Sequence, residues 1–506
     1  MFAIVLGQLA GLARSMLVTS AFGASRELDA FFYANRVSET LFLLVAGGAL
    51  GSAFIPTFTG LLAKGERAAA WRLASAIANA VTLTLSLLAL LTAVFAPQIV
   101  RYLLAPGFAN DPALLALTVS LLRIQLAASV LFGLGGLVVG ILNAHQVFFI
   151  PALTPAMYQF GIIFGALALA PRMGIRGLAW GVVVGAAFYL LLQLPSLLSQ
   201  RGTYQPTLGL DNPDARQVVL LMAPRLLGVA VVQLNFWVNG WIASTMSEGS
   251  MASLSIGFSL MLMAQAAIAQ SVAIAAMPTF SAQHALGKLD EMRSSLAASL
   301  RGVMLAALPA SLGLIALREP LVRLLYQRRE FDETDVQMVA WALLWYAAGL
   351  VGHSLMEVLT RAFYAQHDTK TPVLIGAAAM GLNVVFSFTF PSGFASLGWL
   401  PLGGLALANS LATALEAAAL FLFMRKRLGG LEGPSLLRGF ASAGLAALAM
   451  ALGLWAWLKL TGAASPWLVA PGGVAFGLLI YGLGVTALQV PEIKMLTRMV
   501  STRFRR

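Results

Sequence analysis

Long apolar runs, separated by short polar segments, cover almost the whole chain. A helix of about 20 residues crosses a hydrocarbon layer of about 30 Å, and fourteen of the runs approach or exceed that length. The pattern predicts an all-α integral membrane protein with 14 transmembrane helices. The predicted spans are 2–22, 28–61, 73–96, 114–142, 153–170, 174–198, 217–245, 251–280, 296–317, 337–365, 372–391, 402–424, 436–460 and 466–488.

The composition agrees with this pattern and excludes several kinds of chemistry. The chain is 59% apolar and 10% charged, whereas soluble domains carry about 25% charged residues. It has no Cys, which excludes disulfides and thiolate metal sites, and its four His are too widely spaced for a metal site. There is no Walker A loop and no catalytic constellation. We therefore expect neither an enzyme nor a bound cofactor.

The distribution of basic residues predicts the orientation. The net charge is +12, but the positive residues lie in short loops and the C-terminal tail, which favours an anionic membrane surface over nucleic acid. With both termini in the cytoplasm, the cytoplasmic loops and tail carry twice as many Lys and Arg as the opposite loops. One non-cytoplasmic loop, 318–335, departs from this distribution, because it holds four Arg together with five acidic residues. We predict that both termini are cytoplasmic.

Two halves of the chain repeat one another. Ile55-Pro56-Thr57-Phe58 recurs 222 residues later as Met277-Pro278-Thr279-Phe280, and further matches follow at similar offsets. An offset of six helices makes the halves parallel, pseudo-twofold repeats, and two lobes around a central cavity are a transporter architecture. The alternative is a membrane scaffold with an old duplication. The predicted parts are an N-lobe at 1–200, a linker at 201–216, a C-lobe at 217–424, helices 13 and 14 within 425–488, and a basic cytoplasmic tail at 489–506.

Arg14 lies near the middle of the first span, about 18 Å along a helix that rises about 1.5 Å per residue. A central arginine costs about 2.5–3.5 kcal/mol on insertion scales. No acid lies three or four residues from it on its own helix, so its partner must be another helix, water or an anion. Gln8 shares its face of the helix, and Asp29 and Arg36 share one face of the second span. Polar faces inside a membrane line a bundle interior or a wet cavity.

Several of these polar residues have a simpler interpretation. Glu357 and Arg361 are spaced i, i+4 and could neutralise one another, and Arg36 with Glu39 is a similar pair. Asp29 could be a helix-start residue at the membrane surface. Four residues with neutral oxygens form a candidate cation site, and interhelical hydrogen bonds are the alternative interpretation. They are Asn235, Asn383, Asn409 and Thr413.

Short motifs along most of the chain resemble the MurJ (MviN) family of lipid II flippases, in the same order. They are Ala13-Arg14, Phe22-Gly23-Ala24, Asp29-Ala30-Phe31-Phe32, Gly48-Ala49, Ala53-Phe54-Ile55-Pro56, Ala105-Pro106-Gly107-Phe108, Ile141-Leu142-Asn143, and Phe363-Tyr364 followed by Asp368-Thr369-Lys370-Thr371-Pro372. The family belongs to the group of multidrug and polysaccharide-lipid exporters. The resemblance implies fourteen helices, alternating access, a bacterial cytoplasmic (inner) membrane location, and outward movement of an undecaprenyl-pyrophosphate-linked cell-wall precursor.

The resemblance also implies roles for particular residues. Arg14 and Asp29 match positions important for flipping, and helices 13 and 14 would help to form a groove for the lipid tail. The sequence departs from the family where cavity charges are expected, because uncharged residues stand there. These departures are Gln8, Leu43, Ser259 and Leu262.

The leading hypothesis is a lipid II flippase in which Arg14 contacts the pyrophosphate, since its planar fork fits phosphate oxygens. We expect Asp29 to hold Arg14 when the cavity is empty. The candidate substrate-binding residues are Arg14, Asp29, Arg36, Gln8, Ser259, Arg225, Glu357 and Arg361.

The expected partners are the lipid-linked glycan, membrane lipids and cell-wall synthesis proteins. We expect no nucleic acid, a monomeric chain, and coupling to Na⁺ or to the membrane potential. Two alternatives remain: a cation-coupled exporter of small amphipathic molecules, suited by acids such as Glu416, and a non-transporting scaffold for cell-wall enzymes.

Overall fold

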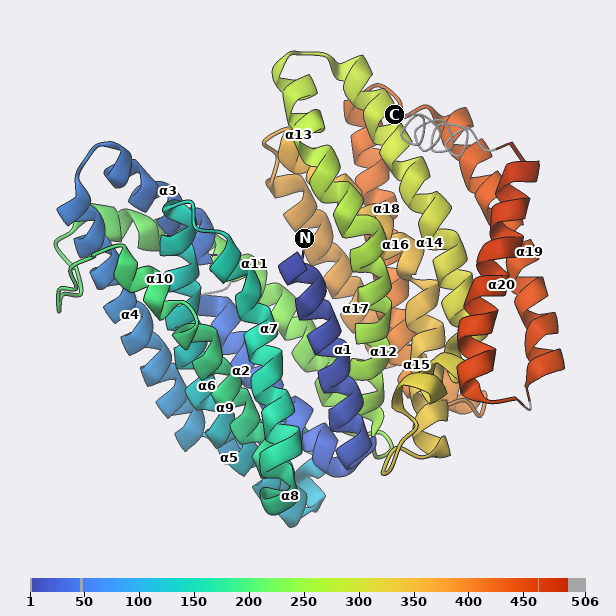
Figure 1. The fold of residues 1–506 in the computed structure, drawn as a ribbon, viewed down its shortest axis with the longest axis horizontal. Helices are drawn as coiled ribbons and strands as arrows, with labels where there is room; N and C mark the ends of the chain where they lie inside the picture. Colours follow the sequence, from blue (N-terminus) through green and yellow to red (C-terminus); the bar gives the residue numbers. More distant parts are fainter. Residues whose placement is uncertain (1, 46–48, 463, 490–506) are drawn as a thin grey trace. The chain divides into compact units, whose positions relative to one another are not determined.

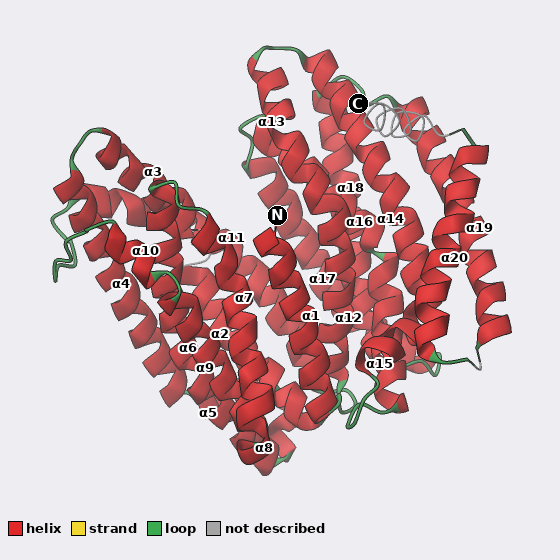
Figure 2. Ribbon diagram, viewed as in Figure 1, coloured by secondary structure: helices red, strands yellow, loops and turns green. Residues whose placement is uncertain are grey.

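The computed structural model describes residues 2–45, 49–462 and 464–489. Within these ranges the secondary structure is helical and contains no strand (Figure 2). The predicted all-α fold is therefore confirmed. The predicted basic tail lies outside the described residues from 490 onward.

The chain divides into two compact units, whose helices are labelled in Figure 1. The first unit comprises Met1–Ala252 with Arg328–Asp332, and the second comprises Ser253–Gln327 with Glu333–Arg506. The first unit contains α1 (Phe2–Phe22), α2 (Arg26–Val45), α3 (Ala49–Ala63), α4 (Arg67–Val94), α5 (Ala96–Gln98), η1 (Ile99–Leu104), η2 (Pro106–Asn110), α6 (Pro112–Ala144), α7 (Phe149–Phe164), η3 (Gly165–Leu169), α8 (Ala170–Met173), α9 (Ile175–Leu191), α10 (Leu194–Ser199) and α11 (Pro213–Ala243).

The second unit begins within α12, whose first turn belongs to the first unit. Its helices are α12 (Ser250–Gln265), η4 (Ala266–Gln270), α13 (Ser271–Ala285), α14 (Leu289–Tyr326), α15 (Glu333–Ala348), α16 (Leu350–Ala365), α17 (Lys370–Ser396), α18 (Leu402–Arg427), α19 (Gly433–Thr461) and α20 (Pro466–Ala487). The lobes inferred from the repeat stay a prediction, because a repeat is a relation between sequences rather than a unit of packing.

Ten helical segments of the described chain are long and apolar enough to cross a membrane. The count becomes eleven when α15 and α16 are taken as one span bent by 45°. The bend falls at Gly349, which packs so closely on α18 that an added Cβ would lie 2.4 Å from the Ser410 hydroxyl. The predicted run 28–61 corresponds to α2 and α3, on either side of residues 46–48, which are not described.

Close helix packing in the first unit depends on small residues. α7 and α9 meet at Gly161 and Gly185, where a Cβ on Gly161 would come within 2.1 Å of the Gly185 Cα. Without side chains between them, the two backbones gain van der Waals contact that bulkier residues would prevent. This pairing fixes α7, which in turn packs on α1 and positions the polar face of that helix.

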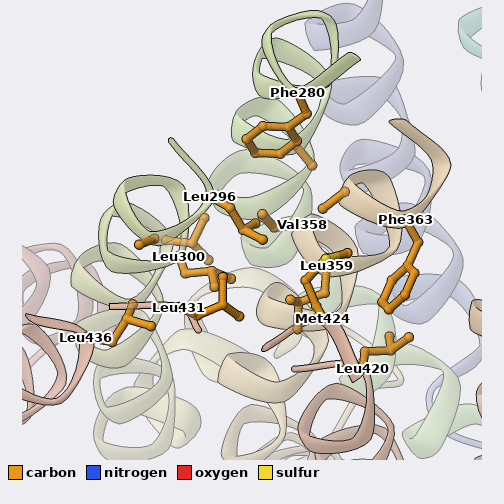
Figure 3. Packing of buried hydrophobic residues seen from close by; sticks show 14 of the residues in the cluster. Phe280, Leu296, Leu300, Val358, Leu359, Phe363, Leu420, Met424, Leu431 and Leu436 are labelled. Atoms are coloured by element: carbon orange, nitrogen blue, oxygen red, sulfur yellow. The ribbon is translucent and has the colours of Figure 1, made fainter. Parts of the chain in front are cut away.

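The second unit has a continuous apolar core between α13, α14, α16 and α18 (Figure 3). Phe280, Leu300, Val358, Phe363 and Leu420 are among its buried residues. Full burial of such side chains stabilises a fold by about 1.5–3 kcal/mol each in water, and in a membrane the close packing itself contributes most.

A second apolar cluster joins α14, α19 and α20. The Tyr481 hydroxyl donates a 2.6 Å hydrogen bond to the Leu305 carbonyl within it. A cavity of about 420 Å³ lies at the end of these three helices, lined by Arg318, Arg323 and Trp455 among others.

Candidate functional site

Arg14 projects from the polar face of α1, next to α7. At Gly11, one turn earlier, an added Cβ would lie 3.7 Å from the Gln159 amide nitrogen. Arg14 of α1 and Glu39 of α2 both act electrostatically on the Tyr158 hydroxyl. Arg14 is half-buried and makes no hydrogen bond or ion pair with the residues that the structure describes. Its guanidinium therefore keeps its donors available for a ligand.

The other cation of this region, Arg36, is already neutralised. Its guanidinium lies 3.4 Å from the Glu39 carboxylate and 4.7 Å from the centroid of the Phe236 ring on α11. The i, i+3 pair suggested by the sequence is confirmed. Because the ion pair and the ring contact both compete with a ligand, Arg36 is a weaker anion site than Arg14.

The rest of the polar face of α2 packs on α11. The Tyr33 hydroxyl donates a 2.9 Å hydrogen bond to the Gly240 carbonyl, and the Trp237 indole N–H donates a 3.0 Å bond to the Thr40 hydroxyl. Thr40 also lies 3.3 Å from the Gln233 side-chain oxygen. These bonds satisfy side chains that would otherwise be costly inside a membrane.

Asp29 has a different partner from the one we expected. Its buried carboxylate, 5% exposed, accepts hydrogen bonds from the backbone N–H groups of Gly249, at 2.9 Å, and Ala252, at 2.7 Å. Gly249 immediately precedes α12 and Ala252 lies in its first turn, so the Asp29 side chain caps the N-terminal end of this helix. The expected Arg14–Asp29 ion pair is therefore not formed in this structure, because the carboxylate is occupied by the end of another helix.

Neighbouring contacts hold the same turn. The Arg26 guanidinium lies 3.0 Å from the Glu248 carboxylate and 3.4 Å from that of Asp111. Gly249 has a φ of +76°, and a Cβ there would collide with the Ala24 carbonyl. We call Arg26, Asp29, Glu248, Gly249 and Ala252 the α2–α12 latch. Sequence reasoning missed Glu248 and Gly249; the Ser-Glu-Gly turn between two spans was the available signal.

In the second unit, Glu357 and Arg361 form the ion pair that their spacing predicts. The carboxylate and guanidinium are 3.0 Å apart on α16. Ser259 on α12 is exposed and donates a 2.8 Å hydrogen bond to the Ser255 carbonyl. Gln8, on α1 in the first unit, is also exposed. The side chain of Arg225, another candidate, is not among those that the structure describes.

Three of the four candidate cation ligands belong to the second unit. The Thr413 hydroxyl lies 3.4 Å from the His353 imidazole, and Asn383 accepts a 3.0 Å hydrogen bond from Ser387. The Asn409 side-chain oxygen is buried and has no hydrogen-bond partner among the described residues. The fourth, Asn235, is in the first unit and accepts a 3.2 Å bond from Asn239.

The Asp368-Thr369-Lys370-Thr371-Pro372 motif begins α17. The Asp368 carboxylate accepts hydrogen bonds from the N–H groups of Lys370 and Thr371 and from the Thr371 hydroxyl, and lies 2.7 Å from Arg427. Burial alone would raise the pKa of Asp368, but these partners outweigh it and lower the pKa to about 2. The motif is thus a charged clamp between the start of α17 and the end of α18.

Comparison with known proteins gives one consistent family. The family model described as lipid II flippase MurJ matches residues 18–470. The chain is 32% identical over 464 residues to the lipid II flippase MurJ of Burkholderia cenocepacia, covering 90% of this chain and 87% of that one. It is 29% identical to a probable lipid II flippase MurJ of Vibrio cholerae, over 82% of this chain and 80% of that one.

Solved structures show the same fold. An inward closed lipid II flippase MurJ matches with a TM-score of 0.82 at 23% identity, over 97% of this chain and 99% of that one. An inward-facing multidrug resistance MATE family transporter matches with a TM-score of 0.72 at 16% identity, over 84% of this chain and 96% of that one. The sequence matches extend over most of the chain, and the chain therefore belongs to the MurJ family of lipid II flippases.

Proposed function

We propose that this chain is an alternating-access flippase that moves lipid II, the undecaprenyl-pyrophosphate-linked peptidoglycan precursor, from the inner to the outer leaflet of the bacterial cytoplasmic membrane. The observation that carries the proposal is the family match over residues 18–470. The fold supports it, because its many apolar helices suit an integral membrane transporter. The protein carries out no covalent chemistry in this proposal, so it is a transporter rather than an enzyme.

The proposed topology has fourteen spans and cytoplasmic termini. Eleven spans come from the described helices when α15 and α16 are joined, and α1, α2 with α3, and α11 would supply three more. The positive-inside bias supports the orientation. We also propose that α19 and α20 form the wall of a groove for the prenyl tail, and the extensive apolar exposure of Leu452, Leu460 and Leu478 on these helices supports this.

The proposed headgroup contact is Arg14. It keeps its donors available within the described residues, whereas Arg36 and Arg361 are each held by an acid on their own helix. An arginine presents two parallel N–H donors to phosphate oxygens. Gln8, exposed on the same helix, is one turn and a half away and would add a neutral hydrogen-bonding group for the headgroup.

Conformational cycling supplies a proposed role for Asp29. The α2–α12 latch holds the first turn of α12 through two bonds to one carboxylate. Release of this turn would free the carboxylate and allow it to act on Arg14 in another state. Coupling of the cycle to an ion or to the membrane potential is part of the proposal.

Depletion of the protein in its native cells tests the function. A flippase predicts that lipid II accumulates in the inner leaflet, where an externally added lipid II-degrading colicin cannot cleave it, while total precursor synthesis continues. A scaffold for cell-wall enzymes predicts instead that lipid II is delivered to the outer leaflet and cleaved normally. The latter result would contradict the proposal.

A further inference from the structure

Glu416 lies midway along α18 and has no counter-ion among the residues that the structure describes. The helix extends from Leu402 to Arg427, so the residue lies near the centre of an apolar span. Its side chain is buried, with 8% of the residue exposed. Within the described part of the chain it makes no hydrogen bond and no ion pair. Intramembrane acids are normally paired, and an unpaired one points to a function.

The helix α17 packs directly on this carboxylate. An added Cβ at Gly376 would lie 3.1 Å from the Glu416 Oε1 atom, so the side chain rests against the α17 backbone. The sequence of α17 contains no titratable residue after Lys370. Nothing on this side can therefore neutralise a negative charge at Glu416.

The other two helices against α18 also offer no free cation. On α16, the His353 imidazole hydrogen-bonds with the Gly349 carbonyl and lies 3.4 Å from the Thr413 hydroxyl. Arg361, on the same helix, forms an ion pair with Glu357 at 3.0 Å. On α15 the titratable side chains are Glu333 and Asp335 at its start and the buried Tyr346. None of these groups compensates a carboxylate in the middle of α18.

Further polar side chains continue along the same side of α18. Asn409, Thr413 and Glu416 are spaced i, i+4 and i+7, which places them in one stripe. The Ser354 hydroxyl on α16 is buried without a partner among the described residues. The Asn409 side-chain oxygen is also buried and forms no direct hydrogen bond of good geometry there, although it interacts with His353. Buried acceptors of this kind suit a site that takes up a proton or water.

An ionised carboxylate in hydrocarbon costs far more than a neutral one, and the neighbours of Glu416 do not offset that cost. We infer that Glu416 is a proton-binding site of this chain, loaded with a proton when closed against Gly376 and able to release it to water when α17 and α18 separate. The step is simple acid dissociation: the carboxyl O–H bond breaks, the electron pair stays on oxygen, and the proton goes to water.

A role for this proton in driving transport rests on the proposed flippase function, whereas the binding site itself does not. A hard cation requires several converging oxygens, and no other oxygen of the described residues forms a hydrogen bond with the Glu416 carboxyl. The site therefore suits a proton better than Na⁺. The inference therefore names the proton as the ion exchanged during the cycle.

Labelling with dicyclohexylcarbodiimide tests the site directly. The reagent is soluble in lipid and reacts with protonated carboxyl groups. The carboxyl O–H adds across one carbon–nitrogen double bond of the carbodiimide, and the adduct rearranges to a stable N-acylurea. Purified full-length protein in nanodiscs should be labelled at Glu416 at neutral pH, as located by peptide mass spectrometry, and labelling should fall as the medium becomes alkaline. Glu357 is the matched control in the same unit, because its carboxylate is paired with Arg361 at 3.0 Å and should stay unlabelled.

Three results would overturn the inference. One is the absence of labelling at Glu416 at every pH at which the protein stays folded. Another is labelling of Glu357 equal to that of Glu416. The third is protection of Glu416 by excess NaCl but not by choline chloride at constant pH, which would show a sodium site. Gly376→Ala should slow the labelling several-fold by crowding Oε1, and an unchanged rate would contradict the placement against α17.

The transport role has its own measurement. In proteoliposomes, an imposed pH gradient should change the rate of lipid II flipping by wild-type protein and leave the rate of Glu416→Gln unchanged. Labelling without any flipping would leave the proton site intact and refute the proposed function. Equal responses of wild type and Glu416→Gln to the gradient would refute the coupling role while flipping itself persists.

Discussion

Replacing Asp29 by Asn should open the α2–α12 latch. The side-chain oxygens accept two backbone N–H bonds, from Gly249 and Ala252. A lost hydrogen bond costs about 0.5–1.5 kcal/mol, and a buried donor left unpaired costs about 1–3 kcal/mol. Asn keeps one acceptor but turns its amide N–H₂ towards the other donor. One bond is lost and one buried donor is left unpaired. The expected loss is about 2–3 kcal/mol of latch stability, or an increase of about 30- to 150-fold in the open population.

Cysteine alkylation measures that population, because the chain has no native Cys. Ala252 is fully buried in the latch, so Ala252→Cys should react slowly with a water-soluble maleimide. The rate should rise about 30- to 150-fold when Asp29→Asn is added, since reaction through a rapidly opening state follows the open population.

Glu248→Gln is the matched control for this measurement. Its ion pair with Arg26 is about half exposed, and exposed pairs contribute about 0–1 kcal/mol. The alkylation rate should then rise less than about fivefold. Equal rates in the Asp29→Asn and parent backgrounds would refute the reasoning, as would a larger effect of Glu248→Gln.

Two further predictions concern the charged pairs of the second unit. Replacing both Glu357 and Arg361 by Gln should preserve flipping better than either single change, because a single change leaves one uncompensated charge; a double variant worse than both singles would show that the pair contacts substrate. Asp368→Asn should lower the melting temperature at neutral pH, because the pKa of Asp368 is lowered to about 2 and its ionised form is stabilised by folding. That stabilisation is complete above the unfolded pKa of about 3.9 and is lost as the pH falls towards 2, so wild type and variant should converge in acid; a constant difference in melting temperature would contradict this.

Local sequence spacing predicted the parts of the structure that depend on one helix. Long apolar runs predicted helices because the backbone must satisfy its own hydrogen bonds in lipid. The pairs Arg36–Glu39 and Glu357–Arg361 were predictable because residues three or four apart share a helix face. In each case the interacting groups lie within two turns of one another.

Contacts between distant segments were not predictable in this way. Asp29 was expected to hold Arg14, yet it binds backbone groups more than 200 residues away. A backbone N–H carries no side-chain signal, so the sequence pointed to the nearest cation instead. The bend at Gly349 likewise depends on its close approach to Ser410 of α18, which only the packed structure reveals.

The measurement that tests the central claim most directly is lipid II flipping by purified protein with changes at Arg14. Proteoliposomes with labelled lipid II would compare wild type, Arg14→Ala and Arg14→Lys at matched incorporation. Arg123→Lys is the control, because its guanidinium is exposed and binds only the Ala93 carbonyl among described groups. We predict flipping by wild type and Arg123→Lys, none by Arg14→Ala, and a reduced rate for Arg14→Lys, since an ammonium keeps the charge but loses the two-pronged contact. Full activity of Arg14→Ala would contradict the account and place the headgroup site elsewhere.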